Sequence, residues 1–207
     1  RAHRLRDLRI AVWSQEPGQA TSSEITAAIE TLAAQLECEG VEVSRTARPN
    51  FDPVDAYRLY LALLEAALSA RDSAEELTRK RTAKAQLQSD DIRTDAFSLR
   101  AVDMSHSEWL RLNEQRHQIR RAWAAFFDQW DVLLCPAFTV PALSHMQEGA
   151  THERSYAVDG RNIAYNDMLF WPGITGGYYL PASVAPIGKS SEELPIGVQI
   201  VGPLYGD

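Results

Sequence analysis

Cysteine is scarce in this sequence of 207 residues, which contains only Cys38 and Cys135, far apart and in apolar surroundings. Neither cysteine has the C-x-x-C or Cys/His spacing of a redox or zinc motif, so neither kind of site is expected. A free cysteine in such surroundings behaves as a small hydrophobic residue. We therefore predict that both are core residues of a protein in a reducing, cytoplasmic compartment.

Long apolar runs and a surplus of positive charge are also missing. No stretch reaches the roughly eighteen apolar residues of a transmembrane helix, and no apolar segment follows the N-terminal arginines as in a secretory signal. The 21 Lys and Arg residues are outnumbered by 28 Asp and Glu residues, which gives a net charge of −7. Binding to a phosphate backbone needs clustered basic residues. The sequence predicts neither a nucleic acid nor a membrane as partner.

Metal-binding patterns are absent among the histidines. No two of them have i, i+4 spacing, and no carboxylate-rich motif accompanies them. They are His3, His106, His117, His145 and His152. Surface and capping roles are the better interpretation, and no metal or cofactor is expected.

The first fifty residues predict a strand, a helix and a second strand. Apolar and charged residues alternate over 8–13, and apolar residues then recur at helical spacing from Ile25 to Leu36. The S/T-x-x-E sequence from Thr21 to Glu24 is typical of a helix start. Strand spacing resumes at 41–43. This order favours parallel pairing with a right-handed crossover.

The remaining chain predicts further helices and strands. Helices are expected over 53–68, within 74–104 with a break near residues 89–91, over 105–130, and over 162–170. The apolar run 131–136 predicts a buried strand, and two more strands are expected over 182–187 and 196–201. Residues 139–163 are expected to form a long loop or a short insertion. The fold class is therefore α/β, with about five strands and four to six helices.

Candidate nucleophiles have weak sequence support. Ser183 lacks the flanking glycines of a nucleophile elbow, and Cys135 lies in a predicted strand with no visible thiolate-stabilising neighbour. Gly188-Lys189-Ser190 lacks the earlier glycine of a phosphate-binding loop and predicts a turn. We therefore assign no catalytic residue in this chain.

The most unusual stretch is 170–203, which is rich in aromatic residues, glycine and proline and has almost no charge before Lys189. It is expected to form a buried, shaped wall. Two roles stay open for the aromatic side chains in and near it, because buried Tyr and Trp serve both plain cores and ligand pockets. The candidates for the lining of a substrate pocket are Tyr165, Phe170, Trp171, Tyr178 and Tyr179.

Three segments resemble the C-terminal half of amidase signature enzymes. Residues 131–137 (DVLLCPA) resemble the buried strand of the family that ends in proline. Residues 180–188 (LPASVAPIG) resemble its G-x-P-A-x-S-V-P-x-G stretch, although Ala185 separates Val184 from Pro186. Residues 194–203 (LPIGVQIVGP) match its L-P-x-G-x-Q-x-x-G-P stretch and are the most specific of the three.

The resemblance implies an amidase-like mixed β-sheet flanked by helices, and hydrolysis of carboxylic amides through a serine acyl-enzyme intermediate. The family's serine nucleophile, second serine and lysine belong to a Gly/Ser-rich segment and an upstream lysine that have no counterpart here. We therefore expect residues 1–207 to be the C-terminal portion of a single amidase domain, incomplete and inactive alone.

The resemblance leaves alternatives open. The chain could instead belong to the A subunit of a tRNA-dependent amidotransferase, which is a glutaminase that works with partner chains, or it could be a non-catalytic binding or scaffold module. For the complete enzyme the resemblance implies a small-molecule amide substrate. The oligomeric state also stays open, with a homodimer among the alternatives.

Overall fold

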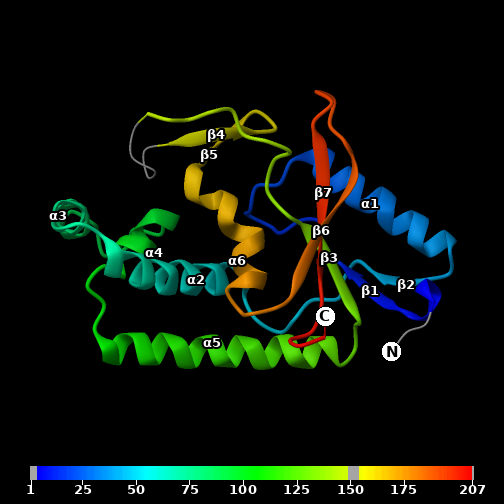
Figure 1. Cartoon of the computed structure of the whole chain (residues 1–207), viewed down its shortest axis with the longest axis horizontal. Helices are drawn as coiled ribbons and strands as arrows, with labels where there is room; N and C mark the ends of the chain where they lie inside the picture. The colour runs from blue at the N-terminus through cyan, green and yellow to red at the C-terminus, as the bar shows by residue number, and fades with distance from the viewer. Residues whose placement is uncertain (1–3, 149–153, 207) are drawn as a thin grey trace. The chain divides into compact units, whose positions relative to one another are not determined.

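The computed structural model describes residues 4–148 and 154–206, and the chain divides into two compact units. Unit 1 comprises residues 1–50 and 121–207, and unit 2 comprises residues 51–120. All strands of the described residues belong to unit 1, whereas unit 2 is helical (Figure 1).

A five-stranded mixed sheet forms the centre of unit 1. Its strands are β1 (Arg9–Val12), β2 (Glu42–Ser44), β3 (Val132–Pro136), β6 (Ala182–Lys189) and β7 (Pro195–Val201). Their order is β2-β1-β3-β7-β6, with β1 parallel to β2 and β3, and β7 antiparallel to β3 and β6. The predicted α/β class, the parallel β1–β2 pair and the three later sheet strands are confirmed.

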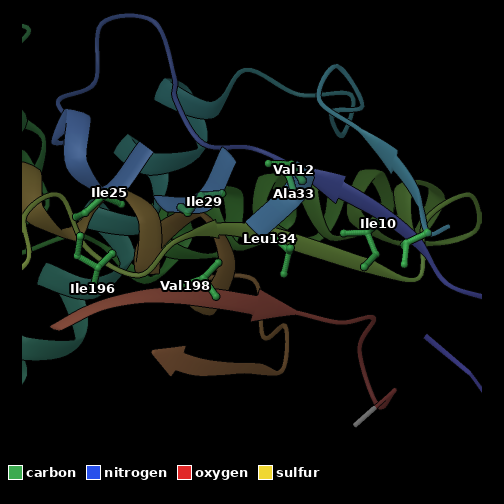
Figure 2. Close-up of a cluster of buried hydrophobic side chains, with 9 residues drawn as sticks. Ile10, Val12, Ile25, Ile29, Ala33, Leu134, Ile196 and Val198 are labelled. Atoms are coloured by element: carbon green, nitrogen blue, oxygen red, sulfur yellow. The ribbon is translucent and has the colours of Figure 1, made fainter. Parts of the chain in front are cut away.

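Helix α1 (Ser23–Cys38) connects β1 to β2 and packs on the sheet. Ile25, Ile29 and Ala33 recur every four residues, so they lie on one face of the helix. Figure 2 shows the side chains of this face gathered with those of β1, β3 and β7. The strand residues of this core are Ile10, Val12, Leu134, Ile196 and Val198. Burial of these aliphatic side chains is the main source of stability for this part of unit 1.

An ion pair joins the start of β1 to the residue before β3. The Arg9 guanidinium donates from Nε and Nη2 to the two carboxylate oxygens of Asp131 at 3.2 and 3.0 Å, and the Arg9 amide also donates to Oδ2 at 2.8 Å. These hydrogen bonds hold the pKa of Asp131 below its ordinary value. The contact fixes the alignment of two parallel strands that are separated in the sequence by residues 13–131.

A second, two-stranded sheet in unit 1 was not anticipated from the sequence. Strands β4 (Ser155–Val158) and β5 (Arg161–Ala164) pair as a hairpin within the segment that was expected to be a loop or insertion. Its two-residue turn is Asp159-Gly160, and both residues have positive φ, 47° and 77°. This dipeptide is the strongest short-range hairpin signal in a sequence, so the hairpin was detectable.

The described part of unit 1 also contains three shorter helical segments. They are the 3-10 turns η1 (Leu5–Asp7) and η4 (Tyr165–Leu169) and the helix α6 (Phe170–Gly176). The helix predicted over 162–170 is wrong, because β5 and η4 occupy this range and α6 begins where that helix was expected to end. Pro172 is tolerated in the first turn of α6, where its missing N–H would have no helical acceptor.

Unit 2 consists of helices and the turns between them. They are α2 (Pro53–Leu68), η2 (Ser69–Arg71), α3 (Ala74–Ala85), α4 (Thr94–Arg100) and most of α5 (His106–Phe127), whose last residues belong to unit 1. The predicted break between two helices near residues 89–91 is confirmed. So is the start of α5, because Ser105 and Glu108 exchange hydrogen bonds in a capping box, Ser105 N to Glu108 Oε2 at 2.9 Å and Glu108 N to Ser105 Oγ at 3.3 Å.

The two cysteines differ in environment. Cys135 on β3 is buried, as predicted, but Cys38 is exposed, so its assignment to the core is wrong. Cys38 is the last residue of α1, and its position does not continue the four-residue spacing of Ile25, Ile29 and Ala33 that packs on the sheet. Among the described residues, no helix is long and apolar enough to cross a membrane.

Candidate functional site: the wall formed by α6 and β7

The stretch 170–203 folds into α6, β6 and β7, and its polar centre is Gln199 on β7. Gln199 lies opposite Cys135 of β3 in the antiparallel ladder, and its side chain is buried. Its amide nitrogen donates to Cys135 Sγ at 3.2 Å and to Thr175 Oγ1 at 3.1 Å. Burial of an amide group costs free energy unless the group is hydrogen-bonded. These two contacts therefore fix the position of β7 relative to β3 and to α6.

Thr175 and Trp171 extend these contacts through α6. The Thr175 hydroxyl accepts a hydrogen bond from Gln199 and donates to the Trp171 carbonyl at 3.2 Å, one helical turn earlier. The Trp171 indole Nε1 donates to Thr21 Oγ1 at 2.9 Å, just before α1. The result is a buried set of polar contacts, the Gln199 network, which comprises Cys135, Gln199, Thr175, Trp171 and Thr21.

Aromatic rings pack around this network. The Trp171 ring meets Phe170 at 5.1 Å and Trp13 at 5.9 Å between centroids, both in edge-to-face geometry. The Arg48 guanidinium lies 4.9 Å from the Trp13 ring centroid and donates to the Val12 carbonyl at 3.1 Å. Partial burial lowers the pKa of Arg48 from its ordinary value, but an arginine remains charged at neutral pH.

The five predicted pocket residues occupy three different environments. Phe170, Trp171 and Tyr178 are almost completely buried in unit 1. Tyr165 is half-buried at the hairpin, beside Met168 and Tyr156, whereas Tyr179 is 48% exposed. Buried side chains could support a pocket wall only from behind, and Tyr179 is the one of the five that solvent reaches freely. The pocket role of all five stays a prediction.

Tyr179 also has an unusual backbone. Its φ is 67°, in the left-handed region that non-glycine residues rarely adopt. It follows α6 closely, and its amide donates to the Gly176 carbonyl at 3.1 Å. A bulky residue in this conformation costs stability, and such strain persists where the surrounding structure enforces it. The left-handed backbone thus lies shortly after α6, at a residue whose aromatic side chain is exposed.

Strand β6 differs from the buried wall that the sequence predicted. It is the edge strand of the sheet, and none of its residues is fully buried. Val184 is 62% exposed. The expectation of a buried wall therefore fails for β6, although it holds for α6 and β7. Edge position explains the difference, because β6 has a paired neighbour on one side only among the described residues.

The two candidate nucleophiles have no activating group. Complete burial raises the pKa of the Cys135 thiol to about 12, so the reactive thiolate is not formed near neutral pH. Ser183 is exposed on β6, and within residues 4–148 and 154–206 its hydroxyl has no hydrogen-bond acceptor. No group of three or more potential metal ligands occurs in these residues either.

Sequence reasoning missed the Gln199 network because its members are spread from Thr21 to Gln199. One signal was present. Gln199 is the only strongly polar residue of β7, whose sequence is PIGVQIV, and a polar residue within an apolar strand needs a buried partner. The identity of that partner depends on the packing of α6, which local sequence does not give.

Comparison with known proteins places these features in one family. The family model described as Amidase matches residues 1–207. The A subunit of glutamyl-tRNA(Gln) amidotransferase from Synechococcus sp. (strain CC9902) is 29% identical over 197 residues, which cover 86% of this chain and 38% of that protein. The 2-amino-5-chloromuconic acid deaminase of Comamonas testosteroni is 26% identical over 204 residues, which cover 97% of this chain and 40% of that protein.

A solved structure shows the same fold. A bacterial aryl acylamidase of the amidase signature family superimposes with a TM-score of 0.62 at 16% identity, over 94% of this chain and 40% of that one. The chain thus spans about 40% of the length of the proteins it matches. With a family model that matches all of its residues, the chain belongs to the amidase family.

Proposed function

We propose that this chain supplies sheet strands and one wall of the substrate pocket to an amidase that hydrolyses carboxylic amide C–N bonds. The observation that carries the proposal is the match of the whole chain to the Amidase family. In the proposed enzyme the amide would acylate a serine, and water would release the acid. The nucleophile and its base would come from outside residues 1–207, because Cys135 and Ser183 lack activation.

The wall in this proposal has a buried support and an exposed surface. Phe170, Trp171 and Tyr178 form the support, and the Gln199 network fixes it to the sheet. Tyr179 and Tyr165 retain exposed surface and are the proposed contacts with the acyl or amide group of the substrate. The exposed strand β6 would be covered by the catalytic portion, since an edge strand with apolar side chains favours pairing or burial.

The first test is an assay of the 207-residue chain with simple aryl and aliphatic amides. We expect no turnover above the buffer rate, because neither candidate nucleophile of the described residues, Cys135 or Ser183, has an activating group. Turnover that a serine-directed phosphonate removes would contradict the proposal that the nucleophile lies outside residues 1–207.

Reading the coding sequence upstream of Arg1 is the second test. A Gly/Ser-rich segment with an earlier lysine would support the proposal, whereas a start codon directly before Arg1 would favour a non-catalytic module.

A second candidate function is that of the A subunit of a tRNA-dependent amidotransferase. It is favoured by the 29% identity to the corresponding chain of a glutamyl-tRNA(Gln) amidotransferase. In that case the substrate would be glutamine and the enzyme would need partner chains. A glutaminase assay of the longer protein, with and without added partner chains, separates this function from that of an independent amidase, which would turn over aryl or aliphatic amides without partners.

We also propose a reducing, cytoplasmic location. Both cysteines are free, and Cys38 is exposed without a disulfide partner among the described residues. Mass spectrometry after alkylation under non-reducing conditions should find Cys38 labelled.

A further inference from the structure

Unit 2 contains a pocket that the proposed function does not use. Its volume is about 390 Å³, at the lower end of the range for small-molecule sites. Ala62 of α2 and Lys84 of α3 line it together with side chains from α4, the turn after α4, and α5. We call it the helical pocket.

Two rows of side chains with the same spacing form most of the helical pocket. Each row has i, i+3, i+4, i+7 spacing. The second row lies within α5, where this spacing places side chains on one face of the helix, and the first row runs from α4 into the turn that follows it. The first row is Phe97, Arg100, Ala101 and Met104. The second row is Glu108, Arg111, Leu112 and Gln115. The first row combines Arg100 with three apolar side chains, whereas the second combines Arg111 with Leu112 and two polar side chains. The pocket therefore offers both a charged and an apolar contact surface.

The carboxylates near this pocket are engaged elsewhere. The Arg81 guanidinium donates to both oxygens of Asp103 at 2.7 and 2.8 Å, and Arg93 likewise holds Asp91. Neither arginine lines the pocket. Among the described residues, no carboxylate lies within ion-pair distance of Lys84, Arg100 or Arg111. These three lining cations therefore keep charge that no direct ion pair neutralises.

Glu108 is the one carboxylate in the lining. Its Oε2 accepts hydrogen bonds from the Ser105 amide and hydroxyl at 2.9 and 2.7 Å, which hold the pKa of Glu108 below its ordinary value. It is therefore ionised at neutral pH and partly offsets Arg111. One carboxylate against three cations still leaves the pocket with a surplus of positive charge.

Two of the cations are held in place by the backbone. Arg100 Nη2 donates to the carbonyls of Gln88 and Asp91 at 3.1 and 2.7 Å, and its guanidinium lies 5.2 Å from the Phe97 ring centroid. Lys84 Nζ donates to the Val102 carbonyl. These contacts leave further N–H groups on both side chains, and fixed donors lose little conformational freedom when a ligand binds.

We propose that the helical pocket binds a small carboxylate with an apolar body, such as an aromatic monocarboxylate. The carboxylate would accept hydrogen bonds from Arg111 and the remaining donors of Arg100 and Lys84. The ring would lie among Phe97, Met104 and Leu112. This inference does not depend on the proposed amide hydrolysis, since it concerns a binding equilibrium in unit 2.

Calorimetric titration of the purified protein with benzoate tests the proposal, with benzamide as the neutral ligand of the same shape. We expect saturable benzoate binding with a dissociation constant of about 1 mM or tighter, and at least about tenfold weaker binding of benzamide. Arg111→Gln should weaken benzoate binding about threefold to tenfold. The matched control is Arg79→Gln, an exposed arginine of α3 outside the pocket, which should bind benzoate like the wild type.

A second variant tests the apolar part of the pocket. Ala62→Phe places a ring into the cavity and should abolish benzoate binding, provided that circular dichroism shows an unchanged helix content. If that variant does not fold, the benzoate titration of Arg111→Gln and the benzamide titration of the wild type still test the proposal. Equal affinity for benzamide and benzoate, unchanged affinity in Arg111→Gln, or no saturation up to about 10 mM benzoate would each overturn the proposal.

Discussion

Strands β7 and β6 are neighbours in the sheet and in the sequence, yet their environments are opposite. β7 lies between two strands, and four of its seven residues are buried. β6 is an edge strand with no fully buried residue, although Ser183 and Lys189 are the only polar residues in its sequence ASVAPIGK. β7 has a paired strand on each side, and its one polar side chain, Gln199, has hydrogen-bond partners. β6 instead exposes an apolar surface that a further element would stabilise.

The comparison extends to α6, whose side chains share the buried environment of β7. Removing a large buried side chain from this part should therefore have the largest effect. Trp171→Ala should lower the free energy of unfolding by about 3–5 kcal/mol, because it leaves a cavity beside Trp13 and Phe170 and removes the hydrogen bond to Thr21. Urea unfolding followed by fluorescence measures the change.

Tyr179→Ala is the control for that experiment. Tyr179 is another aromatic residue of the same stretch, but it is 48% exposed. We expect a change within about 0.5–1 kcal/mol. Similar losses in the two variants would show that α6 is not the buried support of the wall.

The second effect concerns the polar contacts of β7. Gln199→Leu removes the donor to Thr175 and Cys135 and should cost about 1–3 kcal/mol, since the Thr175 hydroxyl then loses one of its partners in a buried site. The double variant Gln199→Leu with Thr175→Val removes both partners. It should be more stable than the sum of the two single changes predicts, by about 0.5 kcal/mol or more. Urea unfolding of the three variants gives the coupling, and additive losses would mean that the two side chains do not act as one network.

The sequence predicted the strands and helices of the sheet because each has a local signal. The apolar run 132–136 and the spacing of Ile25, Ile29 and Ala33 specify β3 and α1 without knowledge of their partners. The exposure of β6 had no such signal. Whether a strand lies at an edge depends on which other strands pair with it, and that is set by the order β2-β1-β3-β7-β6.

The candidate site was predicted only in outline for the same reason. The aromatic residues were found by composition, but their separation into buried Trp171, half-buried Tyr165 and exposed Tyr179 follows from the packing of α6 and of the β4–β5 hairpin. The hairpin itself was encoded locally by Asp159-Gly160 and could have been predicted.

A smaller effect is expected where β6 and β7 touch. Gly197 of β7 lies opposite Pro186 in the ladder, and a Cβ atom at Gly197 would lie 2.8 Å from Val184 Cγ1. Gly197→Ala should therefore cost about 1 kcal/mol, a modest amount because the exposed Val184 side chain has room to move. Adding Val184→Ala removes the clash, so thermal melting should show that Gly197→Ala costs less in that background. An equal cost in both backgrounds would place the strain in the backbone of β7.

The smallest effect in the isolated chain is expected on the outer side of β6, and it tests the proposed covering of this strand. Val184→Lys should change the free energy of unfolding of the 207-residue chain by no more than about 0.5 kcal/mol, because the side chain is 62% exposed. In a longer amidase whose catalytic portion covers β6, the same change buries a charge and should cost several times more. Glu192→Lys, in the exposed turn between β6 and β7, is the control and should have a small effect in both proteins. Melting curves of the two variants in the two proteins give the comparison. If Val184→Lys is as mild in the longer protein as in the chain alone, β6 is a true edge, and its exposed apolar surface has no covering element.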